Sequence, residues 1–95
     1  MNIQQAIMMD EKDNVATLLT AIEKGHQVQI KVGERSFTVQ AKETIPYGHK
    51  IALKDIEKGG KVIKYSEVIG QALDPIEEGT HVHVHNTESL SAKNL

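Results

Sequence analysis

The sequence predicts a mainly β domain with one short α-helix. Three observations indicate this class. The β-branched residues dominate the apolar set, with ten Ile and eight Val against six Leu. Apolar and polar residues alternate over several short stretches, and glycines recur at the ends of those stretches. With 95 residues, the chain is long enough for one domain with one hydrophobic core.

The helix is predicted from about Asn14 to Lys24. Its apolar positions fall at i, i+3, i+4 and i+7 and would share one face: Val15, Leu18, Leu19 and Ile22. Asp13 is placed to cap the start of this helix, and Gly25 can end it in the left-handed conformation. Before the helix, residues 6–9 predict a short strand.

Beyond Gly25 the apolar period changes from 3.6 to two residues. Val28, Ile30 and Val32 alternate with polar residues, and a turn at 33–35 leads into residues 36–40, which predicts a β-hairpin with one buried face. Further short strands are predicted at residues 50–53, 61–64, 68–72 and 80–86. Residues 1–86 are therefore assigned to one domain and residues 87–95 to a polar C-terminal tail or the start of a linker.

One short pattern occurs four times. It consists of an aliphatic residue, two mostly polar residues, a glycine, two more residues and a second aliphatic residue, and it covers residues 22–28, 45–51, 56–62 and 76–82. In each copy the glycine permits a turn with positive φ, and the flanking aliphatic residues point into a core. Because the copies are irregularly spaced, the pattern predicts a compact β domain with sharp corners and no solenoid.

Composition excludes several classes of function. Eleven Lys and Arg against thirteen Asp and Glu give a net charge of −2, and the signs are interspersed, so neither nucleic acid nor membrane is expected as a partner. The absence of cysteine excludes disulfides and thiolate metal sites. The N-terminus has no basic region followed by an apolar run, so no secretory signal is expected, and the predicted location is cytoplasmic.

Five histidines are the main candidates for chemistry, and His81, His83 and His85 alternate along one predicted strand. The three imidazoles would share one face, while Val82 and Val84 would be buried on the other. Such imidazoles can bind a divalent metal, and one can carry a proton near neutral pH. An exposed strand face that merely contains histidine explains the pattern about equally well.

A second candidate set is His49, Lys50 and Lys64. Pro46 and Gly48 form a turn that ends at His49 and Lys50, whose side chains leave a strand on opposite faces. Lys50 or Lys64 would suit an anionic carboxylate, although solvated lysines at sheet edges are the more common case. His26 follows the predicted helix stop and receives no role. The sequence contains no phosphate-binding glycine loop and no serine elbow, so a site that requires a partner is more credible than a complete enzyme.

Several motifs together resemble the N-terminal SAF domain of the UxaA family, which comprises the altronate and galactarate dehydratases and has the small subunit of sulfolactate sulfo-lyase as a relative. The motifs lie at residues 13–16, 45–56, 62–65, 68–70 and 79–86. The resemblance implies a β-clip fold. It also implies the N-terminal domain or small subunit of a sugar-acid dehydratase, a hydro-lyase, which covers and completes a metal-dependent active site located mainly on a larger catalytic domain or subunit.

The resemblance implies a divalent metal, Fe²⁺ or Mn²⁺, in the complete enzyme, and no activity in the isolated domain. Dehydration needs a base, an acid and a cation that stabilises an enediolate. On the matching positions we assign His49 and His85 as catalytic, Lys50, Lys64 and Asn86 as substrate-binding, and His83 and His85 as metal ligands. The substrate, a sugar acid, stays open among altronate, galactarate and sulfolactate, and so does self-association into a homo-oligomer.

The sequence departs from the family pattern at two positions. Ser66 stands where relatives commonly have glycine, and Thr87 stands where an aliphatic residue is usual. Two other classes of function also stay open. One is a non-catalytic SAF-type module that binds carbohydrate or another ligand, and the other is a purely structural subunit.

Overall fold

The computed structural model describes residues 4–90, and every regular element in this range is a β-strand. The strands are β1 (Gln5–Ile7), β2 (Val15–Leu18), β3 (Gln27–Val32), β4 (Arg35–Gln40), β5 (Lys50–Ala52), β6 (Lys61–Lys64), β7 (Glu67–Ala72), β8 (His81–Val82) and β9 (Thr87–Ser89). No helix long and apolar enough to cross a bilayer occurs in the described range. The mainly β class predicted from the sequence is confirmed.

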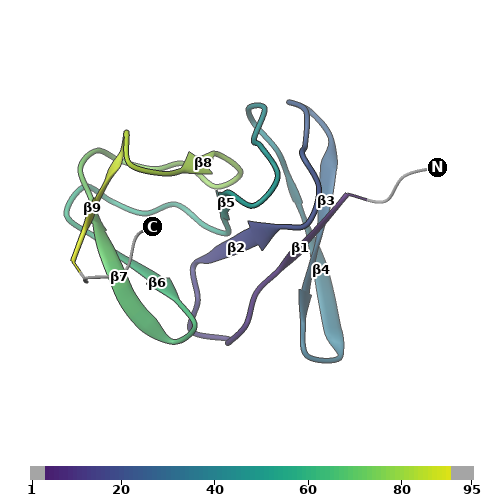
Figure 1. Ribbon diagram of the computed structural model, residues 1–95, viewed down its shortest axis with the longest axis horizontal. Coiled ribbons are helices and arrows are strands. Elements are labelled where there is room, and N and C mark those ends of the chain that lie inside the picture. Colours follow the sequence, from purple (N-terminus) through teal and green to yellow (C-terminus); the bar gives the residue numbers. More distant parts are fainter. Residues whose placement is uncertain (1–3, 91–95) are drawn as a thin grey trace.

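The strands form two sheets (Figure 1). The first has six strands in the order β4-β3-β1-β2-β5-β8, and the second has three in the order β6-β7-β9. All neighbours are antiparallel except β1 and β3, which pair in parallel. In Figure 1 the hairpins β3-β4 and β6-β7 stand on opposite sides of the molecule, with β2 and β5 between them.

The four predicted corners are confirmed, and they associate in pairs. Their glycines all have left-handed φ: Gly25 at 93°, Gly48 at 82°, Gly59 at 83° and Gly79 at 87°. The aliphatic residues that open the corners form two antiparallel bridges, Ile22 with Ile45 and Ile56 with Ile76. Each pair of corners therefore closes the chain at the base of one hairpin.

The two hairpins and their corners are built in the same way. The backbone N–H of Gly25 donates to the carbonyl of Ala41 at 2.7 Å, and that of Gly59 donates to the carbonyl of Ala72 at 2.8 Å. The corner that opens the second hairpin, at Ile56, lies 34 residues after the one that opens the first, at Ile22. The corner that closes the second hairpin, at Ile76, lies 31 residues after the one at Ile45. The domain thus consists of two similar halves, a relation that the irregular spacing of the four corners hides in the sequence.

Strands β2 and β5 separate two apolar cores. Successive side chains of a strand point to opposite faces, so Ala16 and Ile51 join one cluster of buried residues while Val15 and Ala52 join the other. The first core also takes the apolar face of β3, where Val28 and the other predicted inward residues are buried. The second lies between the two sheets and includes residues from β6, β7 and β8.

The predicted helix from Asn14 to Lys24 is wrong. Val15–Leu18 form strand β2, Ile22 belongs to the first corner, and Leu19 is 42% exposed, so it does not share a buried face with its neighbours. A central strand packed on both faces shows no alternation of apolar and polar residues. The run of buried residues in β2 therefore matches a helical period only by coincidence of spacing.

Asp13 caps a turn of the second hairpin, not a helix. Its buried carboxylate accepts hydrogen bonds from the backbone N–H groups of Met9, Asp10, Tyr65 and Ser66, at 2.7 to 3.2 Å. Tyr65 and Ser66 form the tip of the β6-β7 hairpin, and both have positive φ, 55° and 64°. The carboxylate thus fixes a turn in which two residues other than glycine adopt the left-handed conformation.

The segment that the sequence predicts as a tail or linker contains a strand. Thr87–Ser89 form β9, which pairs with β7, and Thr87 is buried. These three residues are therefore part of the second sheet. The end of that segment, residues 91–95, lies outside the described residues.

Candidate functional site

The histidine-rich segment leaves its strand after two residues. Strand β8 ends at Val82, and the backbone turns over residues 83–86, so the single strand predicted at 80–86 is wrong. Asn86 fixes this turn: its Oδ1 accepts from the backbone N–H of His83 at 3.0 Å, and its Nδ2 donates to the carbonyl of His81 at 2.8 Å. Such side-chain hydrogen bonds compete with strand pairing. Val82 is fully buried, as the sequence predicts. Val84 is 67% exposed, so the prediction that it is also buried is wrong.

Four imidazoles nevertheless gather into one group, which we call the histidine cluster: His49, His81, His83 and His85. The ring centroids of His49 and His83 lie 4.4 Å apart in a stacked arrangement, and those of His49 and His81 lie 5.0 Å apart. His85 joins through His81, with centroids 5.1 Å apart. His49 comes from the corner before β5, and the other three come from β8 and the turn after it, which lie close together because β5 pairs with β8.

The second corner positions His49. Its backbone N–H donates to the carbonyl of Pro46 at 3.2 Å, and its carbonyl accepts from the N–H of Leu18 at 2.9 Å. Strand β5 then begins at Lys50 and pairs with β8, which places Ile51 opposite His81. The corner therefore places the imidazole of His49 next to His81, which is 32 residues away in the sequence.

A direct hydrogen bond joins two members of the cluster. Nδ1 of His49 lies 2.8 Å from Nε2 of His81, so one ring donates a proton and the other accepts it. Burial, together with the nearby His49, His85, His83 and Lys50, lowers the pKa of His81 from its ordinary 6.5 to about 4. Burial, followed by the charges of His49, Lys50 and His85, also lowers the pKa of His83. Both rings are therefore neutral at pH 7 and keep a lone pair available.

His83 has a polar atom without a partner. Its Nδ1 is buried and forms no hydrogen bond within the described part of the chain. Buried polar atoms are almost always satisfied in folded proteins, so such an atom calls for an explanation. A bound ligand or metal ion is one of the few groups that could satisfy it.

Lys50 is a buried cation beside the cluster. The residue is only 3% exposed and forms no ion pair within residues 4–90. Burial, and then the charge of Lys64, lowers the pKa of its amino group. Lys64 itself places its Nζ 4.8 Å from the centroid of the Tyr65 ring. The two predicted substrate-binding lysines are thus electrostatically coupled, and neither is neutralised by a carboxylate in the described range.

Two residues near this site escaped the sequence assignment, His81 and Glu43. One ligand atom from each of His49, His81 and His83 lies within 4.8 Å of the other two, and the same holds for Glu43, His81 and His85. Within the described residues no such group contains both His83 and His85, the pair predicted as metal ligands. The alternation of histidines was a sequence signal for His81. Nothing in the sequence points to Glu43.

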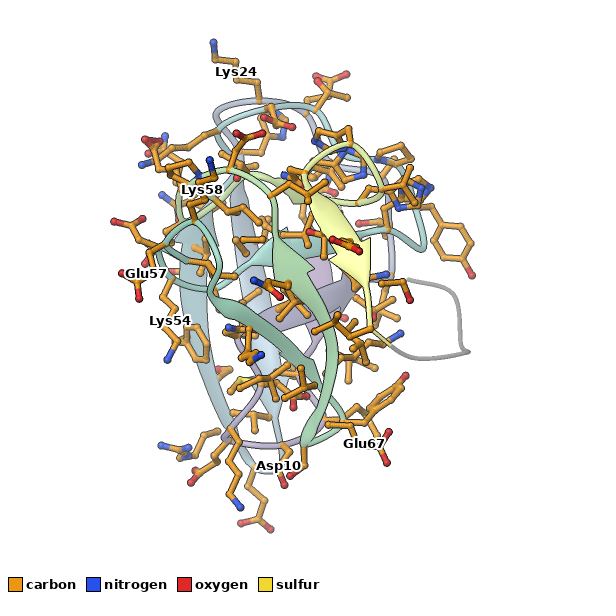
Figure 2. All side chains as sticks on the ribbon, turned by 90° about the vertical axis from the view of Figure 1, so that its left-hand side faces the viewer. Asp10, Lys24, Lys54, Glu57, Lys58 and Glu67 are labelled. Carbon is orange, nitrogen blue, oxygen red and sulfur yellow. The ribbon has the colours of Figure 1, made fainter. Side chains whose placement is uncertain are left out.

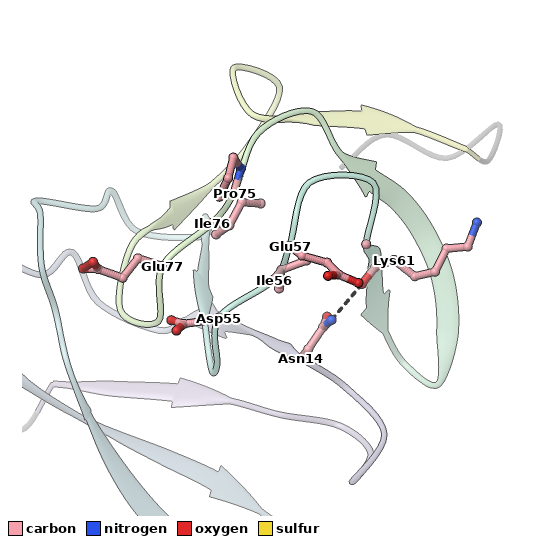
Figure 3. Close-up of a pocket in the computed structure, with 9 residues that line it drawn as sticks. Asn14, Asp55, Ile56, Glu57, Lys61, Pro75, Ile76 and Glu77 are labelled. Carbon is pink, nitrogen blue, oxygen red and sulfur yellow. Dashed lines mark hydrogen bonds between the residues drawn. The ribbon is translucent and has the colours of Figure 1, made fainter.

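An open groove lies elsewhere, between the third and fourth corners (Figure 3). Its lining includes Ile56, Ile76 and the charged Glu57 and Lys61, but no member of the histidine cluster. The Asn14 amide in its wall already donates to the carbonyl of Lys61 at 2.8 Å (Figure 3). Figure 2 shows Glu57 and its charged neighbours pointing outward on this side. None of the described residues that line the groove has a buried side-chain polar atom without a hydrogen bond, whereas His83 has one, so the histidine cluster is the better candidate site.

The fold and the cluster define a small all-β domain in which four imidazoles, two of them with lowered pKa values, gather near a buried amino group. Residues 4–90 match the family model of the altronate/galactarate dehydratase SAF domain. The chain therefore belongs to this family, as the resemblance of its motifs indicated.

Known relatives fall into two groups that differ in length. The chain is 42% identical over 85 residues to altronate dehydratase of Escherichia coli K12, a match that spans 90% of this chain and 16% of the relative. It is 38% identical over 77 residues to galactarate dehydratase of the same organism, which covers 80% of this chain and 14% of that protein. By contrast, 36% identity to the alpha subunit of (2R)-sulfolactate sulfo-lyase of Chromohalobacter salexigens spans 87% of this chain and 92% of the relative. The chain thus corresponds to a small part of the dehydratases and to nearly all of the lyase subunit.

Proposed function

We propose that this chain is the N-terminal domain or small subunit of a sugar-acid hydro-lyase of the altronate/galactarate type. In this proposal its histidine cluster covers an active site that lies mainly on a larger catalytic domain or subunit. The observation that carries the proposal is the convergence of His49, His81, His83 and His85 beside Lys50, which forms no ion pair with any residue from 4 to 90. The relatives add support, because their names denote lyases, and one of them is a subunit.

The cations suit the substrate class. Altronate, galactarate and sulfolactate, the substrates named for the relatives, are all anions. Lys50 and Lys64 have no acidic partner in the described range, so a substrate carboxylate would form their ion pair. Asn86 contributes indirectly, because both ends of its amide hold the turn that presents His83 and His85.

The imidazoles suit the proton transfers of a dehydration. The reaction removes a proton next to a carboxylate and protonates the departing hydroxyl group, and both steps need groups that exchange protons near neutral pH. His49 and His85 are the proposed proton carriers, and the hydrogen bond between His49 and His81 holds the His49 ring in place. A divalent metal, Fe²⁺ or Mn²⁺, would supply electrostatic stabilisation of the developing enediolate. His83 offers an unsatisfied nitrogen for such an ion.

The larger partner and the cytoplasmic location are parts of the same proposal. The dehydratase relatives are about six times longer than the matched segment, since the match spans 16% of altronate dehydratase. We therefore expect no turnover by the isolated domain. Self-association of this chain stays open.

The test is to capture the domain from an extract of its native source, size the polypeptides recovered with it, and assay metal-dependent water loss from altronate and galactarate. The proposal expects a larger companion, fused or separate, together with activity. In that complex His85→Ala should lower turnover by about a hundredfold, as expected for the loss of one acid or base. The matched control is His26→Ala, which changes a histidine outside the cluster.

Recovery of the chain alone, without activity, would contradict the proposal. If the isolated chain then bound a sugar acid in a calorimetric titration without metal, a ligand-binding module would replace it. If alanine were tolerated at every histidine of the cluster while a companion was recovered, a purely structural subunit would replace it.

A further inference from the structure

We propose that His49, His81 and His83 form a binding site for a first-row transition-metal dication within this chain itself. The isolated domain would then bind such an ion without any larger partner. This inference does not depend on the hydro-lyase function, because a metal-binding SAF domain with a different partner would satisfy it equally well. If it holds, His49 is a metal ligand and His85 is the proton carrier of the proposed function.

The donor atoms are close to the arrangement that a metal needs. One ring nitrogen from each of the three residues lies within 4.8 Å of the other two, and the closest pair, His49 Nδ1 and His81 Nε2, is 2.8 Å apart. In a tetrahedral site with bonds of 2.0 to 2.1 Å, the ligand nitrogens lie about 3.3 Å from one another. The closest pair is shorter than this value, and no pair is more than 4.8 Å apart, so rotations of the side chains would bring the three nitrogens to a common ion.

The backbone holds these ligands in position. His49 ends a corner whose backbone hydrogen bonds tie it to Pro46 and Leu18, and His81 lies in β8, paired with β5. His83 donates its backbone N–H to the side chain of Asn86. The three residues are half-buried, so less side-chain freedom is lost on binding than at an exposed site.

A second, independent observation points to a ligand. The Nδ1 atom of His83 is buried and without a hydrogen bond in the described part of the chain. A metal ion bound between the three rings would interact with a nitrogen of this kind, whereas an apo site leaves it unsatisfied. The positive charge of the nearby Lys50 opposes the binding of a metal ion. The negative charge of Glu43, which lies within reach of His81 and His85, offsets this repulsion.

The donor type decides the class of ion. Imidazole nitrogens suit Zn²⁺, Fe²⁺, Ni²⁺ and Cu²⁺, whereas Mg²⁺ and Mn²⁺ favour carboxylate, carbonyl and water oxygens. Three protein ligands also leave a coordination position open for water or another small molecule, which is typical of catalytic sites. The structure therefore favours Fe²⁺ or Zn²⁺ over Mn²⁺ in this domain.

The test uses the full 95-residue chain without an affinity tag, after treatment with a chelator. Calorimetric titration with Zn²⁺ should show one site per chain, and Co²⁺ should produce the visible absorption of a low-symmetry nitrogen site. Mg²⁺ should produce no comparable heat. Each of His49→Ala, His81→Ala and His83→Ala should weaken Zn²⁺ binding by at least about tenfold, since even residues that only support a ligand cost 10- to 100-fold.

The control variants separate this site from its alternatives. His26→Ala lies outside the cluster and should leave the affinity unchanged. Loss on His85→Ala and Glu43→Gln, with retention on His49→Ala, would overturn the assignment in favour of the other three residues. No saturable binding, or binding that no single substitution weakens, would overturn the site altogether.

A thermal unfolding curve of each metal-free variant shows whether the fold is retained. The size-conserving variants His49→Gln and His83→Gln repeat the test with less disturbance of the packing. Because the readouts are heat and absorption of the isolated chain, their failure is distinguishable from failure of the hydro-lyase assay in the complete complex.

Discussion

Gly48 and Gly79 occupy equivalent corners in the two halves of the fold, but their surroundings differ. Both have left-handed φ, 82° and 87°. A Cβ atom added at Gly48 would meet nothing within 4 Å, whereas one added at Gly79 would lie 2.2 Å from the carbonyl oxygen of Gln40 and 3.2 Å from Cγ of Lys42. Alanine at Gly48 therefore tests backbone strain alone, whereas alanine at Gly79 tests backbone strain together with steric overlap.

The expected magnitudes follow from these two terms. An alanine in the left-handed region costs about 1 to 2 kcal/mol, and Gly48→Ala should lower the free energy of unfolding by this amount alone. Gly79→Ala adds an overlap with backbone, and overpacking of this kind costs a further 1 to 3 kcal/mol. The overlap is hard to relieve because the carbonyl of Gly79 accepts from Lys42 and its N–H donates to Ala52, both at 2.9 Å.

Urea denaturation of both variants, followed by circular dichroism, measures the difference. We expect Gly79→Ala to be less stable than Gly48→Ala by about 2 kcal/mol, with similar m-values. Small domains have total stabilities of about 5 to 15 kcal/mol, so both variants should fold. Equal destabilisation within about 0.5 kcal/mol would refute the contact of the fourth corner with Gln40 and the reasoning built on it.

Three further predictions concern the second hairpin and the histidine cluster. Asp13→Ala removes the acceptor of four backbone N–H groups and should lower the free energy of unfolding by about 2 to 4 kcal/mol. The exposed control Asp74→Ala should change it by less than about 0.5 kcal/mol, and similar effects of the two in urea would contradict the capping role. Ser66→Gly removes the strain of a positive φ, 64°, and should raise the free energy of unfolding by about 1 kcal/mol. The control Ser36→Gly in strand β4 should lower it. A lower free energy of unfolding for Ser66→Gly would contradict the prediction. Because the pKa of His81 falls from 6.5 to about 4 on folding, the unfolded chain binds the proton more tightly. The stability of metal-free protein should therefore be complete above pH 6.5, decrease as the pH falls toward 4, and change no further through this group below it. Partial exposure limits this contribution to roughly 1 to 2 kcal/mol. Urea titrations of the parent and His81→Gln should show a shallower pH dependence for the variant, and parallel curves would argue against the shifted pKa.

The strands that alternate in the sequence were predicted well, and the strand that does not alternate was mistaken for a helix. Val28, Ile30 and Val32 lie on a sheet with one buried face, so their period of two is visible. Strand β2 lies between two cores and is buried on both faces, which removes that signal. The helix cap predicted at Asp13 is also wrong, because two of its hydrogen-bond partners, Tyr65 and Ser66, lie more than fifty residues away and leave no local signal in the sequence.

Some residues of the candidate site have a signal in the sequence. The alternation of histidines points to the segment 81–85, and the proline-glycine corner points to His49. The expected single strand at residues 80–86 failed because one side chain, Asn86, redirects the backbone through two hydrogen bonds. The proximity of Glu43 to His81 and His85 depends on the packing of separate loops and leaves no local trace in the sequence.

By itself the sequence determined the class of fold, the hairpins and the four glycine corners, because these depend on alternation over a few residues and on φ values that glycine adopts most readily. Its motifs also indicated the family. Only the tertiary structure decided which imidazoles meet. His49 and His81 are 32 residues apart, and their hydrogen bond exists because β5 and β8 pair in one register, with Lys50 opposite Val82. A register of this kind is set by the packing of two cores across the whole domain, and no local stretch of the chain contains it.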